Sequence, residues 1–297
     1  MNEETKNEKV FELLESTKLN WTVNKEPLVG IDGKATESFG MFRNDNDKWL
    51  GTVGNQYRAY QNHEMAELMV QASDGIGLDV TKGGSMNEGR KVFLQIPLED
   101  KLIGPDTVKR NLTCLNSHDG STSISFGSTN TVVSCSNQFH RISREKGMNR
   151  FRHSANSKDR INQAMQDMRI ALGHDEELMK NFEIMANMPI KDEIFARVMT
   201  KAFGVNLDAK TGEFSTRKIN TMKTVAATIE GELDAKGSTL WGLFNGVTYY
   251  TNHIAQNSDK DDYVMLGGGY KTNLSAFNEV MKWIDENSKT PREAVLI

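Results

Sequence analysis

The hydrophobic pattern of the chain changes its period near residue 135, and this change limits the folds that the chain can adopt. Between residues 76 and 135 apolar side chains alternate with others, as at Val92, Leu94 and Ile96, and a period of two is typical of a strand with one buried face. Beyond this point apolar residues recur mostly at helical spacing. We therefore expect an α+β fold: an antiparallel meander of three to five strands flanked by helices, followed by a mostly helical C-terminal half.

Turn residues divide the alternating region into separate strands. Asp119-Gly120 lies between two runs of β-forming residues, and Asp-Gly is a strong hairpin signal because glycine adopts a positive φ angle without strain. Gly54-Asn55 predicts a second tight reversal upstream. The expected strands are residues 49–53, 58–60, 92–98, 110–115, 122–126 and 131–135.

Helical spacing and capping residues predict the helices. Asn62 can cap the second one, because its side-chain oxygen accepts a backbone N–H, and Gly173 and Gly204 are expected to end later ones. Residues 256–272 are polar and rich in glycine, which indicates a loop. The expected helices are residues 7–16, 63–72, 136–146, 158–172, 176–187, 190–203, 216–233, 238–255 and 274–287.

The size and composition of the chain fit a globular protein. It has 297 residues, of which 37% are hydrophobic and 26% are charged, and a chain of this length buries a core without disulfide bonds. We expect an N-terminal arm and helix over residues 1–40, an α+β core over 41–172 and a helical region over 173–297.

The number of cysteines and the lack of long apolar runs indicate where in the cell the protein is located. Cys114 and Cys135 are the only cysteines, which is not the framework of a secreted disulfide protein. The N-terminus has no signal-peptide pattern, and no run of about 18 apolar residues could cross a membrane. We therefore expect a cytoplasmic protein without membrane contact.

One segment is strongly basic although the net charge of the chain is −4. Residues 138–160 contain seven arginines and lysines against Glu145 and Asp159, so this segment carries +5 and the remainder −9. Cations that neutralise phosphates release counterions and supply sequence-independent affinity for nucleic acid, and interleaved aromatic rings can stack on unpaired bases. The expected contact residues are Arg141, Arg144, Lys146, Arg150, Phe151, Arg152, His153, Lys158 and Arg160.

The same run of charges also has a structural interpretation. Basic runs are often solvated helix faces neutralised by acidic neighbours, and the chain has 40 acidic residues. Phe139 and Phe151 are equally consistent with core positions. The nucleic-acid surface is therefore a hypothesis that stands beside a solvated face.

The sequence contains no recognisable catalytic or metal-binding signature. His118-Asp119 suggests acid–base chemistry, but adjacent residues on a hairpin tip rarely orient one another, and turn chemistry already explains Asp119-Gly120. The six histidines lack the spacing of zinc ligands. Neither glycine-rich stretch, at 83–84 or 267–269, continues as a phosphate loop. We expect no enzymatic activity, no metal and no cofactor.

Several short motifs follow one another along the chain. They are Gly51-Thr52-Val53-Gly54-Asn55-Gln56-Tyr57, Gln61-Asn62-His63-Glu64, Ser117-His118-Asp119-Gly120-Ser121, Val132-Val133-Ser134-Cys135-Ser136-Asn137, Arg152-His153-Ser154, and Trp241-Gly242-Leu243-Phe244-Asn245-Gly246-Val247-Thr248 with Asn252-His253. Over about residues 40–285 this combination resembles a family of phage- and plasmid-borne proteins that share a domain of unknown function. Gly246 stands where the family pattern has alanine, and Asn252 where it has aspartate. The resemblance implies a mobile-element context and an intracellular location, but no activity.

The order of helix, antiparallel meander and helix, with a basic segment after the sheet, is also similar to that of single-strand annealing proteins of the RecT and Red-beta kind. This likeness of element order implies an oligomeric DNA-binding protein of recombination or replication that favours single strands. Two other hypotheses stay open. One is a metal-dependent nuclease that uses His118, Asp119 and His153, and the other is a phage protein-interaction factor that acts on host machinery through its acidic surface.

Overall fold

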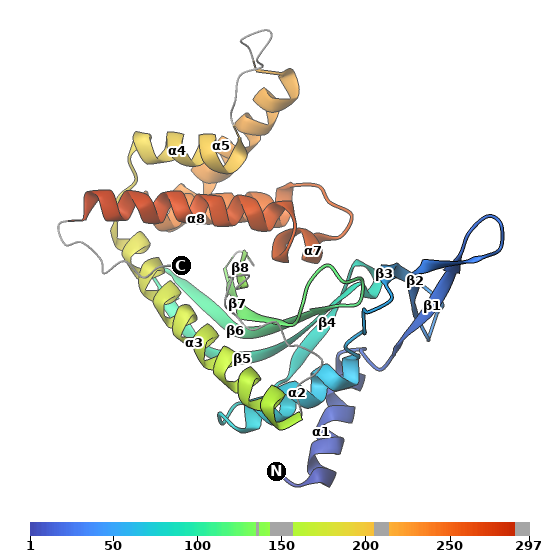
Figure 1. The fold of residues 1–297 in the computed structure, drawn as a ribbon. Helices are drawn as coiled ribbons and strands as arrows, with labels where there is room; N and C mark the ends of the chain where they lie inside the picture. The colour runs from blue at the N-terminus through green and yellow to red at the C-terminus, as the bar shows by residue number, and fades with distance from the viewer. Residues whose placement is uncertain (135–136, 143–156, 205–213, 289–297) are drawn as a thin grey trace. The chain divides into compact units, whose positions relative to one another are not determined.

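The structure is a computed structural model, and it describes residues 1–134, 137–142, 157–204 and 214–288. Figure 1 shows the arrangement of its elements. In chain order they are α1 (Glu3–Ser16), β1 (Val23–Val29), β2 (Ala35–Arg43), β3 (Trp49–Gly54), α2 (Asn62–Asp74), β4 (Lys82–Met86), η1 (Asn87–Gly89), β5 (Lys91–Ile103), β6 (Asp106–Ser117), β7 (Ser125–Val132), β8 (Gln138–Ile142), α3 (Ser157–Asn187), α4 (Asp192–Phe203), α5 (Thr216–Lys236), α6 (Leu240–Tyr249), η2 (Tyr250–Ile254), α7 (Lys260–Met265) and α8 (Gly268–Asn287).

The fold is α+β, which confirms the predicted class. Strands β1–β2–β3 form one antiparallel sheet, and strands β4–β5–β6–β7–β8 form a second sheet in the order of the chain. Helices make up most of the C-terminal half (Figure 1). None of the helices that the structure describes combines the length and the hydropathy needed to cross a membrane.

The described residues form two compact units. The first takes its residues from Met1–Leu98, Asn111–Ser128 and Ile142–His174, and the second from Glu99–Arg110, Thr129–Arg141 and Asp175–Ile297. Helix α3 and strands β5, β6, β7 and β8 therefore contribute residues to both units. Each unit has its own apolar core.

The core of the first unit gathers around one face of β5. Val92, Leu94 and Ile96 are buried as their alternation predicted, because consecutive side chains of a strand point to opposite faces. They share one apolar cluster with Leu13 of α1 and Met69 of α2. The cluster also contains the thiol of Cys114, which is fully buried, and burial raises the pKa of this thiol far above its usual value.

The core of the second unit is aromatic. Phe182 lies 4.8 Å from Trp241, and Phe139 lies 5.1 Å from Phe244, measured between ring centroids. Phe277 stacks on Phe139 at 5.3 Å. Phe139, which the sequence placed either in the core or among the stacking residues, is therefore a core residue.

Helices α5 and α6 approach each other closely at a glycine. A Cβ atom at Gly246 would lie 2.5 Å from the Cα atom of Ile229, and a second glycine of α6, Gly242, is similarly close to a backbone oxygen. Helices can pack at this distance only where one of them lacks a side chain. The close approach of α5 therefore explains why glycine, and not the alanine expected from the resemblance, stands at residue 246.

Several predicted elements of the first 100 residues are wrong. Residues 58–60 form no strand, and β3 pairs instead with β2, which the sequence analysis did not predict. Strands β1 and β4 were also missed. Their sequences, Val23–Val29 and Lys82–Met86, contain a proline and two glycines respectively, and neither shows a clear alternation.

Three predictions in the second half of the chain are also wrong. Residues 136–146 were expected to be helical, but 138–142 form β8. Gly173 does not end a helix, since α3 runs without interruption to Asn187. Residues 256–272, expected to be a loop, contain α7 and the start of α8. Gly204 does end α4, with the expected left-handed φ of 60°.

Candidate nucleic-acid interface

The basic segment joins strand β8 to helix α3. Arg141 belongs to β8, and Lys158 and Arg160 belong to the first turn of α3, although their side chains are not among the described ones. The remaining predicted contact residues lie outside the described residues: Arg144, Lys146, Arg150, Phe151, Arg152 and His153. The structure therefore describes the two ends of the segment and the residues that contact the first of them.

A side-chain amide holds the start of β8, which is an edge strand of its sheet. The Nδ2 atom of Asn252 donates to the backbone oxygen of Gln138 at 3.1 Å, and its Oδ1 atom accepts from the backbone N–H of Gln138 at 3.3 Å. Asn252 thus takes the place of a neighbouring strand at this residue. Exposed edge groups pair readily with other strands, so this contact protects the edge and fixes the course of β8.

Two further hydrogen bonds hold the residue before β8. Asn137 donates from Nδ2 to the backbone oxygen of Asn245 at 3.1 Å, and its Oδ1 atom lies 3.1 Å from Nε2 of His253. Since a carbonyl oxygen only accepts, His253 donates here and carries a proton on Nε2. We name this set of contacts the β8 latch. Its members are Asn137, Gln138, Asn245, Asn252 and His253.

The latch depends on a local irregularity in the helix that follows α6. Asn252 and His253 lie on η2, a π-helical turn in which the N–H of Ala255 donates to the oxygen of Tyr250 at 2.8 Å. Such turns are rare and often occur at functional sites. Two consecutive residues of this turn contact two consecutive residues of the strand, and the ring of His253 lies 4.6 Å from that of Tyr249.

Sequence reasoning did not predict the latch. Asn137 and Asn252-His253 both belong to motifs that carry the family resemblance, but no role was predicted for either motif. Gln138 and Asn252 are separated by 114 residues, and no local sequence signal connects them. The one sequence signal that links the two motifs is that both carry the same family resemblance.

His140 lies within β8 but adds no charge to the basic segment. Its side chain is buried, and its Nδ1 atom lies 2.9 Å from the hydroxyl of Thr129. Burial lowers the pKa of His140 to about 3. The ring is therefore neutral at physiological pH and serves the fold.

His118 and Asp119 are both occupied by structural contacts. The His118 ring is fully buried, its Nε2 atom lies 2.9 Å from Oδ1 of Asn62, and it packs edge-on against Trp21 at 5.2 Å. Burial lowers the pKa of His118 to about 4. Asp119 accepts the backbone N–H of Ser121 at 2.9 Å, which is the contact of a turn. This arrangement gives the nuclease hypothesis no acid–base pair at these residues.

Arg110 and Lys236 each form a buried ion pair in the second unit. Arg110 donates to Asp175 at 2.7 Å, and Lys236 donates to Asp106 at 2.7 Å. Burial raises the pKa of Asp106, but hydrogen bonds from Lys236, Ser134 and Trp241 outweigh it and hold that pKa below its usual value. Each carboxylate therefore lies against a buried cation and serves the fold.

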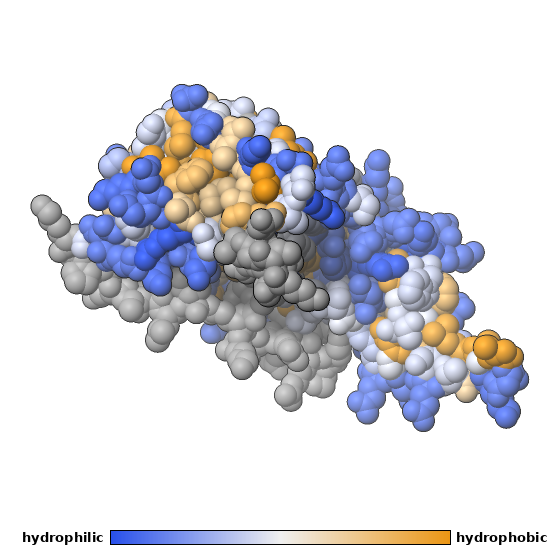
Figure 2. Space-filling model, turned by 90° about the horizontal axis from the view of Figure 1, so that it is seen from above, coloured by the Kyte–Doolittle hydropathy of each residue, from blue (hydrophilic) through white to orange (hydrophobic). Residues whose placement is uncertain are grey.

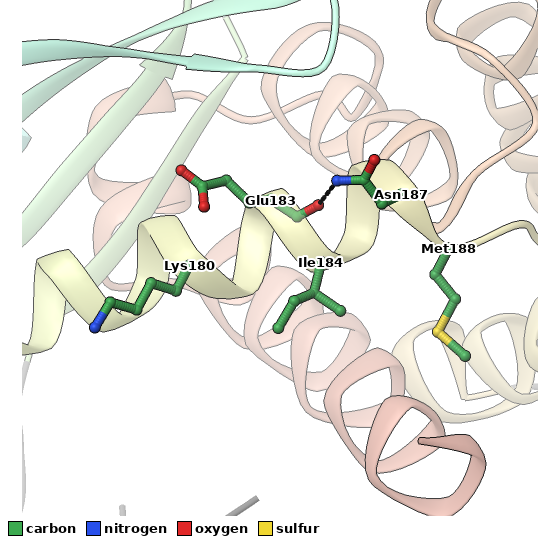
Figure 3. A pocket seen from close by; sticks show the side chains of 5 residues that line it. All are labelled: Lys180, Glu183, Ile184, Asn187 and Met188. Atoms are coloured by element: carbon green, nitrogen blue, oxygen red, sulfur yellow. Dashed lines mark hydrogen bonds between the residues drawn. The ribbon is translucent and has the colours of Figure 1, made fainter. Parts of the chain in front are cut away.

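The described ranges contain no group of three His, Cys, Asp or Glu side chains that could hold a metal ion. A surface hollow of about 500 Å³ lies against the end of α3 (Figure 3). One side-chain hydrogen bond lies there, from Nδ2 of Asn187 to the backbone oxygen of Glu183 at 2.8 Å. Its lining residues are Lys180, Glu183, Ile184, Asn187 and Met188. They come from one stretch of chain, and their polar groups do not converge. A small-molecule site requires polar groups that converge on the ligand.

Comparison with known proteins gives a family without an assigned activity. The family model described as Domain of unknown function (DUF932) matches residues 49–289. No curated protein matches the chain, and no solved structure matches it.

Proposed function

The chain belongs to the family described as Domain of unknown function (DUF932), and from this premise we propose that it binds nucleic acid through its basic segment. The observation that carries the proposal is the charge distribution, with +5 over residues 138–160 and −9 over the rest. An acidic body repels a polyanion, so binding is confined to the segment. Single-stranded DNA is the favoured ligand, because the segment interleaves arginines with Phe151 and His153.

The β8 latch supports this proposal by fixing one end of the segment. Asn252 and His253 hold Gln138 and Asn137 in place, three residues before the first predicted contact, Arg141. A contact residue that is already positioned loses less conformational entropy when it binds. The latch therefore raises the affinity that the cations can provide.

The proposed role needs no covalent chemistry. The segment would hold the phosphate backbone of one strand while the bases remain free to test a complementary strand. We place this activity in the recombination or replication of a phage or plasmid, in the cytoplasm of the host. Such a protein would act by holding two strands together rather than by cutting them.

A salt titration tests the proposal directly. Binding of a fluorescent oligodeoxythymidine is measured by anisotropy at several salt concentrations for the wild type and for Arg150→Glu/Arg152→Glu. Each phosphate contact contributes about 0.7 to the salt slope for single strands, so the variant should lose about 1.4 in slope and at least roughly tenfold in affinity. The matched control is Lys109→Glu/Lys271→Glu, which makes the same change in charge at two exposed lysines outside the segment.

The outcomes separate binding from general electrostatics. Equal loss in both variants would assign the affinity to net charge rather than to the segment. Affinity that is independent of salt, or unchanged in the Arg150→Glu/Arg152→Glu variant, would overturn the proposal. Competition with a duplex of the same length then decides the preference for single strands.

A further inference from the structure

Helix α5 buries one face and leaves the opposite face open. Val225, Ile229 and Glu232 are buried, and they recur at the spacing of one helix face. Figure 2 shows apolar side chains gathered on the surface of the helical unit. On α5 the side chain of Ile219 is 38% exposed, whereas the half-buried Met222 packs against the core of the unit.

The charges of the open face are divided between the two ends of α5. The N-terminal half exposes Arg217 and Lys223 and no acidic residue, whereas Glu230 and Asp234 are exposed in the C-terminal half. Lys218 is half-buried and donates to the backbone oxygen of Phe203 within the unit. Lys236 and Glu232 pair with each other inside the unit at 3.8 Å. Within the described part of the chain, no ion pair joins Lys223, Glu230 or Asp234.

Two copies of α5 that lie antiparallel would place the basic half of each helix against the acidic half of the other. Lys223 and Glu230 are seven residues apart, which is about two helical turns, so they lie on the same face. If a second α5 lies antiparallel against the first, Lys223 of each copy meets Glu230 of the other. The midpoint of that register falls between Ala226 and Ala227, whose small side chains allow two helices to approach closely.

Packing within one copy does not require the glycine at residue 231 of this helix. Gly231 lies inside α5, where glycine is unfavourable because it gains no side-chain contacts and loses backbone entropy. A Cβ atom at Gly231 would meet nothing within 4 Å, so packing within the unit does not require glycine. The absence of a side chain at the exposed Gly231 would let a second helix approach α5 closely at this edge of the open face.

From these observations we infer that the open face of α5 is a dimer interface, on which a second copy of the chain binds through its own α5 in antiparallel orientation. The contact is two-fold symmetric, so the Lys223–Glu230 ion pair occurs twice. The interface goes beyond nucleic-acid binding and does not depend on it. A single helix pair is a small interface, so the dimer is in equilibrium with the monomer.

Charge reversal and its repair test the interface in the absence of nucleic acid. Sedimentation velocity of the full chain, over a concentration series reaching about 100 µM, should show a dimer for the wild type. Lys223→Glu and Glu230→Lys should each weaken the dimer on the order of tenfold or more, because both reciprocal pairs become repulsive. The double variant Lys223→Glu/Glu230→Lys restores opposite charges in both pairs and should dimerise like the wild type.

The controls keep misfolding and unrelated charge effects apart from the interface. Lys201→Glu changes an exposed lysine of α4 and should leave the dimer intact, while Ile219→Asp should abolish it. Thermal unfolding by circular dichroism verifies that each variant is folded. A wild type that remains monomeric throughout the series, or a dimer that the single reversals do not weaken, would overturn the inference without affecting the nucleic-acid proposal.

Discussion

The side chain of Asn252 pairs with both backbone groups of Gln138, as a neighbouring strand would. The first unit repeats this relationship at its three-stranded sheet. The Oε1 atom of Gln61 accepts from the N–H of Val23 at 2.8 Å, and its Nε2 atom donates to the oxygen of Val23 at 2.9 Å. Strand β1, like β8, is an edge strand, so an amide side chain covers one edge in each unit.

Removal of the Asn252 amide should destabilise the second unit. Asn252→Ala leaves the N–H and the oxygen of Gln138 without this partner, and unsatisfied backbone groups that are partly buried cost about 1–3 kcal/mol. We expect the free energy of unfolding in urea to fall by this amount. Asn220→Ala, at an exposed residue of α5, should change it by less than about 0.5 kcal/mol. Equal effects of the two substitutions would exclude the latch as a stabilising contact.

Two glycines of neighbouring helices should respond in opposite directions to the same substitution. Gly246→Ala forces a methyl group against Ile229 and should destabilise the protein by about 1–3 kcal/mol. Gly231→Ala adds a methyl group in open space and should stabilise the isolated chain by about 0.5–1 kcal/mol, because alanine is the better helix former. Thermal unfolding at low protein concentration measures both. A neutral Gly246→Ala would show that α5 and α6 can separate without cost.

The buried histidines should make the protein less stable in mild acid. Burial lowers the pKa of His118 to about 4 and that of His140 to about 3, from 6.5. Below pH 6.5 the unfolded chain therefore binds more protons than the folded one, so stability falls as the pH falls. Between pH 6.5 and 4 each histidine can contribute a loss of up to about 1.4 kcal/mol per pH unit. Urea unfolding between pH 7 and pH 5 checks this, and His118→Asn/His140→Asn should flatten the dependence.

Neutralising one carboxylate of the Arg110 pair should be far more costly than neutralising the other. Asp175 is buried with Arg110, whereas Glu176 also contacts Arg110 but is 56% exposed. Asp175→Asn leaves a buried guanidinium without its inner partner and should lower the free energy of unfolding by about 3–5 kcal/mol. Glu176→Gln should lower it by less than about 1 kcal/mol, since water screens an exposed pair. Similar losses in both variants would contradict this ranking.

The sequence predicted those elements whose signals are local. The alternation around Val92 and the Asp119-Gly120 turn identified the central strands, because a half-buried strand and a tight turn each depend on a few neighbouring residues. Helical spacing likewise predicted a helix over residues 238–255, where α6 lies, and Trp241 and Phe244 within it are buried.

The remaining elements depend on partners that are distant in sequence. Residues 138–142 form a strand because they join the edge of a sheet and are held by Asn252, and their own composition does not show this. For the candidate site, the charged contact residues stay a prediction, and the latch that holds Asn137 and Gln138 was not predicted. A tertiary contact of this kind overrides local propensity.

The π-helical turn gives this region a fixed residue count. It holds one residue more than an α-helical turn, and that extra residue lets Asn252 and His253 face the same strand. A relative that lost one position between Thr248 and Ala255 would rotate one of the two side chains by about 100°. Deletions in this stretch are therefore expected to persist in evolution only together with new residues at Asn137 or Gln138.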